Sequence, residues 1–277
     1  MRRPRFLRSG IAWLALPAVL YGALLFALPL VVLLVGSLRG PQGWTLAAYG
    51  RFLAGAYAWG VIARTLRLAA LTTLACLALG YPAGFALARL RGRLQSLAVA
   101  ALLLPLSLSV IVKAFGWTVL LRRDGVVNLA LHALGLTAAP LRLLFTEAGL
   151  LIGIVNIFLP FMILPIYAGV RQIDRLLPEA AATLGSSPLH CFLRVVLPLT
   201  LPGVGAGCTL VFSLAIAAYV IPTLLMGDAY QTLPTTIATA FLYLQDPQRG
   251  AVAGTVLLIL SLLVVGVSAR FGGRAAA

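Results

Sequence analysis

Residues 177–203 read LPEAAATLGSSPLHCFLRVVLPLTLPG and lie between two long apolar runs. The first part of this stretch predicts a short helix. Pro178 suits the first helical position, where its missing N–H costs no hydrogen bond, and Glu179 then lies beside the positive end of the helix dipole. Gly185 favours a stop after the helix, because glycine readily adopts the left-handed conformation. A polar, regularly punctuated segment of this kind is typical of a docking element for a soluble partner.

A second helix is predicted directly after that stop. Ser187 can cap it and Pro188 can occupy its first position. Its apolar side chains recur at helical spacing and form one expected stripe, made of Leu189, Phe192, Leu193 and Val196. Pro198 is expected either to end this helix or to kink it into the next apolar run. The small side chains of residues 180–182 would let the first helix enter a cleft on another protein. The same spacing also fits an amphipathic helix that rests on lipid headgroups.

The rest of the chain has the composition of a membrane protein. Of its 277 residues, 62% are hydrophobic and 10% are charged, and the mean hydropathy is +1.06. A soluble domain of this length needs far more polar surface, so that class is excluded. Runs of about 20 apolar residues, enough to cross the hydrocarbon core, recur along the chain. Because the apolar residues run continuously and do not alternate, we predict an all-α, polytopic membrane protein and not a β-barrel.

Six transmembrane helices are predicted, over residues 11–37, 62–88, 95–121, 147–170, 200–225 and 249–269. They leave a short cytoplasmic segment, residues 1–10, before a single membrane domain over 11–277 with its core at 62–269. The hairpin belongs to the loop 171–203, between the fourth and fifth helices. A retained first helix is favoured over a cleaved signal peptide, because the first apolar run is too long for a signal sequence.

The positive charge of the chain has a membrane explanation. The formal net charge of +15 would indicate a nucleic-acid partner in a soluble protein. Here the arginines cluster at the ends of the apolar runs, so no nucleic acid is expected. With both termini inside, the cytoplasmic segments hold twelve arginines and the outer segments hold eight. The positive-inside rule therefore predicts that both termini, and the hairpin with them, are cytoplasmic.

The hairpin resembles the EAA loop of ABC importer permeases of the binding-protein-dependent type. The residues in register are Glu179, Ala180, Ala181, Gly185, Val195, Leu197 and Pro198. The resemblance implies a type I, MetI-like permease fold, in which the loop forms coupling helices that insert into a groove on a cytoplasmic ATPase. It also implies which residues couple the permease to that ATPase, namely Glu179, Ala180, Ala181, Gly185, Phe192, Leu197 and Pro198.

The same resemblance implies the partners and the location. The partners are a cytoplasmic dimer of ABC ATPases, a second, similar permease that is expected to form a heterodimer with this chain, and a periplasmic substrate-binding protein. The location is the bilayer of a bacterial inner membrane. This chain contains no GxxxxGKS or GxxxxGKT loop to cradle a phosphate. We therefore expect ATP to be hydrolysed by the separate ATPase, and we expect no bound cofactor and no catalysis in this chain.

Shorter patches resemble the spermidine and putrescine permeases within that family and imply a polyamine cargo. These patches are residues 80–82, 124–128, 159–167 and 219–225. An importer for an anion such as sulfate, molybdate or an aminophosphonate is one alternative, and it would want Lys113, Arg64 and Arg67 to face the path. An ion-coupled secondary transporter is another alternative. It would need ionisable residues near the membrane midplane, and the predicted helices offer almost none.

Four polar residues in the apolar runs are candidates for the substrate path. Tyr219 is the strongest of them, because it lies towards the outer end of the fifth predicted helix. Asn156 and Ser213 also lie within helices, where polar groups often form hydrogen bonds to neighbouring helices. Lys113 follows Arg93 by 20 residues, or about 30 Å of straight helix. We therefore expect Lys113 near the outer interface, as an anchor more than as a substrate contact.

No metal site or catalytic site is predicted. Cys76, Cys191 and Cys208 form no CxxC pattern, and His132 and His190 are far apart in the sequence. We expect neither a bound metal nor a disulfide from this spacing. No Ser/His/Asp arrangement and no pair of carboxylates suggests a reaction, so a membrane-embedded enzyme is disfavoured.

Overall fold

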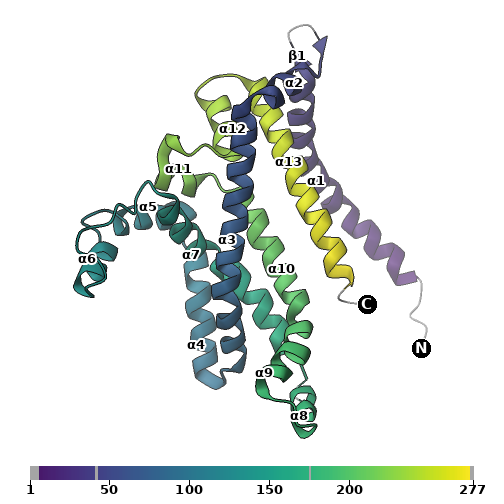
Figure 1. Ribbon diagram of the computed structural model, residues 1–277. Helices are drawn as coiled ribbons and strands as arrows, with labels where there is room; N and C mark the ends of the chain where they lie inside the picture. The colour runs from purple at the N-terminus through teal and green to yellow at the C-terminus, as the bar shows by residue number, and fades with distance from the viewer. Residues whose placement is uncertain (1–5, 41–42, 175, 275–277) are drawn as a thin grey trace. The chain divides into compact units, whose positions relative to one another are not determined.

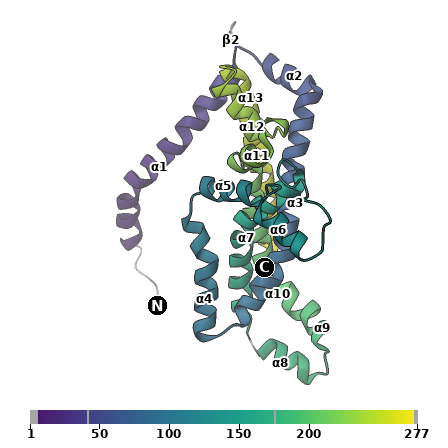
Figure 2. The same ribbon diagram turned by 90° about the vertical axis from the view of Figure 1, so that its left-hand side faces the viewer.

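The computed structural model describes residues 6–40, 43–174 and 176–274, and most of them are helical (Figure 1, Figure 2). Among these residues, five helices are long and apolar enough to span a membrane, or six when one sharply bent pair counts as one span. This confirms the predicted all-α membrane protein. The packing divides the chain into two compact units. The expectation of a single membrane domain over 11–277 stays a prediction.

The first unit combines the residues up to 58 with residues 236–256. Its elements are α1 (Phe6–Leu38), the antiparallel strands β1 (Arg39–Gly40) and β2 (Gly43–Trp44), α2 (Ala47–Ala54), the first residues of α3 (Ala56–Arg89), the end of α12 (Leu233–Leu242) and the start of α13 (Pro247–Arg274). Within this unit α1 packs closely on α13, because a Cβ atom at Gly254 would lie 3.0 Å from the Leu33 side chain. The predicted cytoplasmic segment 1–10 lies partly outside the described residues.

The second unit combines residues 59–235 with residues 257–274. Besides parts of α3, α12 and α13, it contains α4 (Gly92–Leu103), the 3-10 turn η1 (Leu104–Ser107), α5 (Val110–Leu120), α6 (Val126–Ala133), α7 (Glu147–Arg171), α8 (Leu176–Thr183), α9 (Pro188–Cys191), the π turn η2 (Phe192–Val196), α10 (Leu197–Ile216), α11 (Val220–Met226) and the 3-10 turn η3 (Gly227–Ala229). Its hydrophobic core includes buried side chains of α3, α7 and α10, such as Leu68, Met162 and Val211. In both views α8 and α9 project from one end of these three helices (Figure 1, Figure 2).

Glycines let α3 and α10 approach α7 closely. Gly80 and Gly84 lie four residues apart on α3, and Gly203 and Gly207 lie four residues apart on α10. Cβ atoms at Gly80 and Gly207 would lie 2.7 Å and 2.8 Å from the Met162 side chain. A Cβ atom at Gly203 would lie 2.7 Å from a backbone carbonyl oxygen of α7. Both pairs are therefore packing motifs of the small-xxx-small type, which membrane helices use for close association.

The third predicted helix, over 95–121, is not one straight segment. It consists of α4 with η1, and then α5, and the two parts are bent by 97°. Pro105 lies in η1, and a proline removes a helical hydrogen bond and clashes with the preceding turn. A new helix then starts, because the Ser109 side chain accepts a hydrogen bond from Ile111 N at 3.3 Å. The third predicted span is therefore present as one broken span, with Pro105 at the break.

The fifth predicted helix, over 200–225, differs at both ends. It starts earlier, because α9, η2 and α10 form one continuous apolar helix, Pro188–Ile216. It also ends earlier, because a separate helix, α11, begins at Val220. Of the two outcomes expected for Pro198, ending the helix does not occur, and the helix continues into the fifth predicted span. A proline ring clashes with the carbonyl group four residues back, and the wider π turn directly before α10 accommodates it.

Candidate functional site

The first hairpin helix, α8, ends as the sequence predicts. Gly185 has a φ of +78°, which is the left-handed conformation expected after a helix. The backbone N–H groups of Gly185 and Ser186 donate to the carbonyl oxygens of Ala182 and Ala181, each at 3.0 Å. These two bonds satisfy carbonyl groups that a helix end otherwise leaves open. No residue of α8 is buried, so the helix presents most of its surface to the surroundings.

The start of the second hairpin helix is also as predicted. Ser187 caps the helix, because its hydroxyl accepts a hydrogen bond from His190 N at 3.3 Å. Along the predicted apolar stripe, Leu189 is 68% exposed and Leu193 is 50% exposed, whereas Val196 is buried. Part of the stripe is therefore open to the surroundings, and its last residues lie in the π turn η2, where the helical register changes.

An aromatic cluster joins the hairpin to α3. The ring of Phe192 lies 6.1 Å from that of Tyr81 and 5.6 Å from that of Phe85, in both cases edge to face. Edge-to-face pairs at these distances contribute about 0.5–1.5 kcal/mol each beyond the area that they bury. The Tyr81 hydroxyl also forms a hydrogen bond with Thr200 Oγ1 at 3.0 Å. Hence Phe192 contacts α3, and α3 in turn bonds to the first turn of α10.

Sequence reasoning missed this cluster, although a signal for it exists. Tyr81, Phe85 and Arg89 recur every four residues on α3 and therefore share one face of that helix. The Arg89 guanidinium lies 4.3 Å from the centre of the Phe85 ring. An aromatic row that ends in an arginine marks the end of a spanning helix, and a partner ring at that depth could have been expected from the hairpin.

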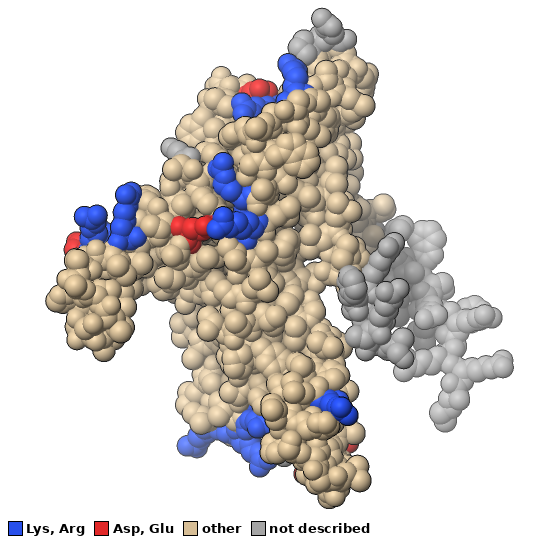
Figure 3. All heavy atoms as spheres, in the orientation of Figure 1, with Lys and Arg blue, Asp and Glu red and all other residues tan. Residues whose placement is uncertain are grey.

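A cavity of about 630 Å³ lies at the base of the hairpin. Its charged lining residues are Arg89, Arg91, Arg171, Asp174 and Glu179. Arginine side chains gather at this end of the second unit, around the projecting hairpin (Figure 3). Glu179 is therefore an acidic group in a mostly basic setting.

The predicted coupling residues fall into two groups. Glu179, Ala180 and Ala181 lie on α8, Gly185 is the second residue after it, and three of these four are exposed. The other three lie further along the continuous helix. They are Phe192 in the aromatic cluster, and Leu197 and Pro198 at the start of α10. The exposed group is therefore open to a partner, while Phe192 faces its own chain.

The far end of the second unit carries a polar network that the sequence did not predict. Arg67 Nη2 and Glu147 Oε2 form an ion pair at 2.9 Å. The Tyr230 hydroxyl donates to Glu147 Oε1 at 3.3 Å. Burial, together with the neighbouring Glu147 carboxylate, raises the pKa of the Tyr230 hydroxyl to about 12, so the phenol stays protonated and keeps this bond. Arg64 donates to the Gln231 carbonyl oxygen at 3.3 Å.

The predicted path residues are placed on different elements. Asn156 on α7 accepts a hydrogen bond from Trp117 Nε1 on α5 at 3.2 Å, so it bonds between helices. Ser213 is partly buried on α10, and Tyr219 lies in the break between α10 and α11. Lys113 is partly buried on α5. Lys113 was expected near the outer interface from its distance to Arg93 along a straight helix. That distance no longer applies, because a 97° bend separates α5 from α4.

Comparison with known proteins agrees with this architecture. The family model described as "Binding-protein-dependent transport system inner membrane component" matches residues 80–275. The chain is 34% identical over 223 residues to the spermidine/putrescine transport permease PotB of Escherichia coli, which covers 80% of this chain and 81% of PotB. It is also 31% identical over 262 residues to the molybdenum transport permease ModB of Mycobacterium bovis, with 93% of this chain and 94% of ModB covered.

A solved structure shares the fold. It is a bacterial ABC transporter involved in the import of the acidic polysaccharide alginate, with a TM-score of 0.80 and 17% identity over 96% of both chains. At this identity the likeness concerns the fold alone. The family match, by contrast, covers most of the chain and includes the hairpin, the aromatic cluster and the glycine pairs. The chain therefore belongs to the inner-membrane components of binding-protein-dependent transport systems, the permeases of ABC importers.

Proposed function

We infer that this chain is the permease subunit of an ABC importer for polyamines of the spermidine and putrescine type. The observation that carries this proposal is the similarity to PotB, at 34% identity over 80% of the chain. The exposed hairpin supports the coupling part of the proposal, because α8 has no buried residue of its own and ends in an ordered stop. A short helix that leaves its surface open suits insertion into a groove of another protein.

The proposed assembly contains four kinds of chain besides the lipid. This subunit pairs with a second, similar permease. Two ATPase chains bind the hairpins from the cytoplasm and hydrolyse ATP, and a periplasmic binding protein delivers the solute. The basic residues around the hairpin support its cytoplasmic side, because Arg89, Arg91 and Arg171 lie at the ends of spanning helices there. Both termini would then be cytoplasmic.

In this proposal, closure of the ATPase dimer moves the hairpin, and the hairpin moves the spanning helices. Two connections support such a transfer. The second hairpin helix continues into α10 without a loop, and Phe192 packs on Tyr81 and Phe85 of α3. Because packed helices move as rigid bodies between discrete arrangements, movement of α8 and α9 would shift α3 and α10 together.

The network around Arg67 supports a cationic cargo over an anionic one. An anion path would want free positive charges on Arg64, Arg67 and Lys113. Instead, Arg67 pairs with Glu147, whereas Arg64 bonds to a neutral backbone carbonyl and keeps its charge. The pairing of Arg67 offsets one positive charge that would repel a polycation, and this suits a polyamine. The similarity to ModB nevertheless keeps molybdate as the second candidate.

The proposal is tested by uptake in cells and in proteoliposomes. Cells that lack this gene should lose saturable uptake of labelled spermidine and regain it with a plasmid copy, while molybdate and sulfate uptake stay unchanged. Proteoliposomes of the assembled transporter should need ATP inside and the binding protein outside. Loss of molybdate uptake with normal spermidine uptake would instead establish the anion importer. Uptake driven by an ion gradient without ATP would establish a secondary transporter.

A further inference from the structure

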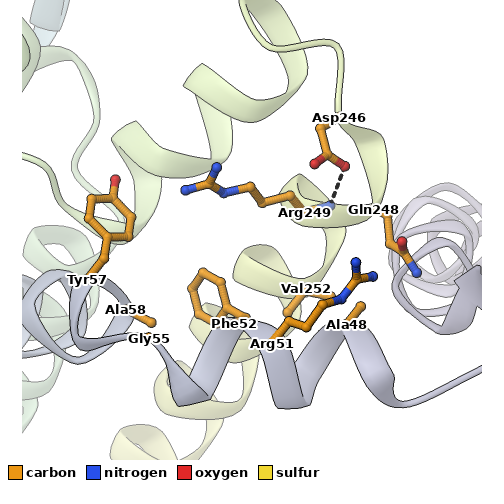
Figure 4. Close-up of a pocket in the computed structure, with 10 residues that line it drawn as sticks. All are labelled: Ala48, Arg51, Phe52, Gly55, Tyr57, Ala58, Asp246, Gln248, Arg249 and Val252. Carbon is orange, nitrogen blue, oxygen red and sulfur yellow. Dashed lines mark hydrogen bonds between the residues drawn. The ribbon is translucent and has the colours of Figure 1, made fainter.

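The first unit contains a cavity of about 360 Å³ that the transport proposal does not use. It is lined by α2, by the first residues of α3 and by the segment that enters α13 (Figure 4). Two arginines contribute to its wall, Arg51 from α2 and Arg249 from the first turn of α13. Cavities of about 300–1,000 Å³ are the size at which proteins hold small ligands and their charged groups.

Positive charge is in excess on this wall. Neither arginine forms an ion pair with a carboxylate of the described residues. The Arg249 side chain extends towards Tyr57, with its guanidinium 5.7 Å from the ring centre (Figure 4). Asp246 is the one acidic residue among the described lining residues. Its Oδ1 accepts a hydrogen bond from the backbone N of Arg249 at 3.0 Å, so this carboxylate caps α13 and leaves both guanidinium groups unpaired.

A second donor on the same wall lacks an acceptor. The side-chain Nε2 of Gln248 is buried and has no hydrogen-bond partner among the described residues. A buried N–H group without an acceptor is unfavourable relative to a satisfied one. This wall thus offers one buried donor without an acceptor, Gln248 Nε2, and two exposed guanidinium groups without an ion pair among the described residues, those of Arg51 and Arg249. Such a set is complementary to an oxyanion, and a guanidinium group binds phosphate with two parallel hydrogen bonds.

The position of the cavity along the chain places it at headgroup depth. One apolar span ends at Leu38, shortly before α2, and another begins at Pro247, two residues before Arg249. Large side chains near it in the sequence are open to the surroundings: Trp44 is 72% exposed and Tyr243 is 76% exposed. Tryptophan and tyrosine gather where lipid headgroups meet the hydrocarbon core. The phosphate groups of phospholipids lie in the same layer.

We propose that this cavity binds the phosphate group of an anionic phospholipid through Arg51 and Arg249, with Gln248 as a further donor. The exposed rings of Trp44 and Tyr243, which lie close to the lining residues in the sequence, favour a lipid over free phosphate, because such rings are typical of the headgroup layer.

The test compares three probes on the full chain purified in detergent. Thermal unfolding is followed as short-chain phosphatidylglycerol, short-chain phosphatidylcholine or inorganic phosphate is added. Phosphatidylglycerol should raise the unfolding midpoint most, and the double variant Arg51→Gln/Arg249→Gln should weaken its apparent affinity by about tenfold or more. Arg39→Gln is the matched control, because Arg39 is an exposed arginine of the same unit that does not line the cavity.

Two further measurements keep the result unambiguous. Circular dichroism and gel filtration check that each variant is folded, and Gln248→Leu offers a milder change that removes one donor without removing charge. Native mass spectrometry should show fewer phosphatidylglycerol molecules retained by the double variant than by Arg39→Gln. An equal effect of inorganic phosphate and phosphatidylglycerol would overturn the lipid assignment. The lipid assignment would also be overturned if the double variant retained as many lipid molecules as the unaltered chain but no longer bound the periplasmic binding protein. The cavity would then serve the soluble partner.

Discussion

The helices around α7 and the α8–α9 hairpin both depend on small residues, but they use them in opposite ways. In α3 and α10 the glycines face α7 so closely that a Cβ atom would collide with it. In the hairpin, a Cβ atom at Gly185 would meet nothing within 4 Å, and no residue of α8 is buried. Small residues therefore allow close packing around α7, whereas in the hairpin they leave the surface open. We expect core substitutions to remove folded protein and hairpin substitutions to remove transport alone.

The largest expected effect is that of Gly203→Leu. Its new Cβ atom would lie 2.7 Å from the Pro165 carbonyl oxygen, so α10 would have to move away from α7. Such overpacking typically costs about 1–3 kcal/mol and occasionally more. We expect little folded protein in the membrane, as measured by fluorescence-detected gel filtration. Gly205→Leu is the matched control on the same helix, because a Cβ atom there meets nothing within 4 Å. Equal losses in both variants would contradict the close-packing explanation.

The next effect is loss of uptake without loss of protein. Gly185→Val should abolish uptake, because a β-branched residue at a φ of +78° is strained by about 1–3 kcal/mol and would open the turn. Glu179→Lys should do the same by reversing the charge on the exposed face of α8. Membrane abundance should stay close to that of the unaltered chain in immunoblots. Gly185→Asn is the control, since asparagine tolerates the left-handed conformation, and it should retain most of the uptake. Normal uptake by both Gly185→Val and Glu179→Lys would defeat the coupling assignment.

A smaller effect is expected from Phe192→Ala, which cuts the contact between the two regions. ATP hydrolysis by the assembled transporter should continue while uptake per ATP falls, because the hairpin would no longer hold α3. Phe85→Ala should give the same result, and the double variant should be no worse than either single one, since residues in one contact are not additive. The measurement is the ratio of transported solute to hydrolysed ATP in proteoliposomes. Additive losses would show that the two rings act separately.

The smallest effect is expected at the other end of the second unit, from Glu147→Gln. The Arg67 side chain is 65% exposed and that of Glu147 is 31% exposed, and exposed ion pairs contribute about 0.2–1 kcal/mol. The unfolding midpoint should therefore fall only slightly at low salt, and the difference should shrink at high salt because of screening. A fall as large as that of Gly203→Leu would show that polar contacts, and not glycine packing, dominate this unit.

Local signals predicted the hairpin well. The stop at Gly185 and the cap at Ser187 depend on residues within a few positions of each other, and both are present in the structure. The number and type of spanning helices also followed from apolar runs alone. These features could be predicted because nearby residues and the thickness of the bilayer decide them.

Features that depend on distant residues could not be predicted in the same way. Arg67 and Glu147 are 80 positions apart, and nothing in the sequence pairs them. Phe192, the first residue of the π turn, packs against rings of α3, and its partners there lie on a helix that is distant in the sequence. The bend in the third span was partly readable, because Pro105 is followed closely by Ser109, a residue that favours helix starts. The bend itself was not predicted, because the residues on both sides of Pro105 are apolar and fit one continuous span.

The unbroken helix from Pro188 to Ile216 makes the hairpin one arm of a lever. Its 29 residues reach about 40 Å at 1.5 Å per residue. The tight contacts of Gly203 and Gly207 with α7 lie near its middle and would act as the fulcrum. With arms of similar length, a push of a few ångströms on the hairpin would reappear at the Ile216 end of the helix with nearly the same size and the reverse direction. A flexible loop in place of η2 would bend, and the movement of the hairpin would not reach α10.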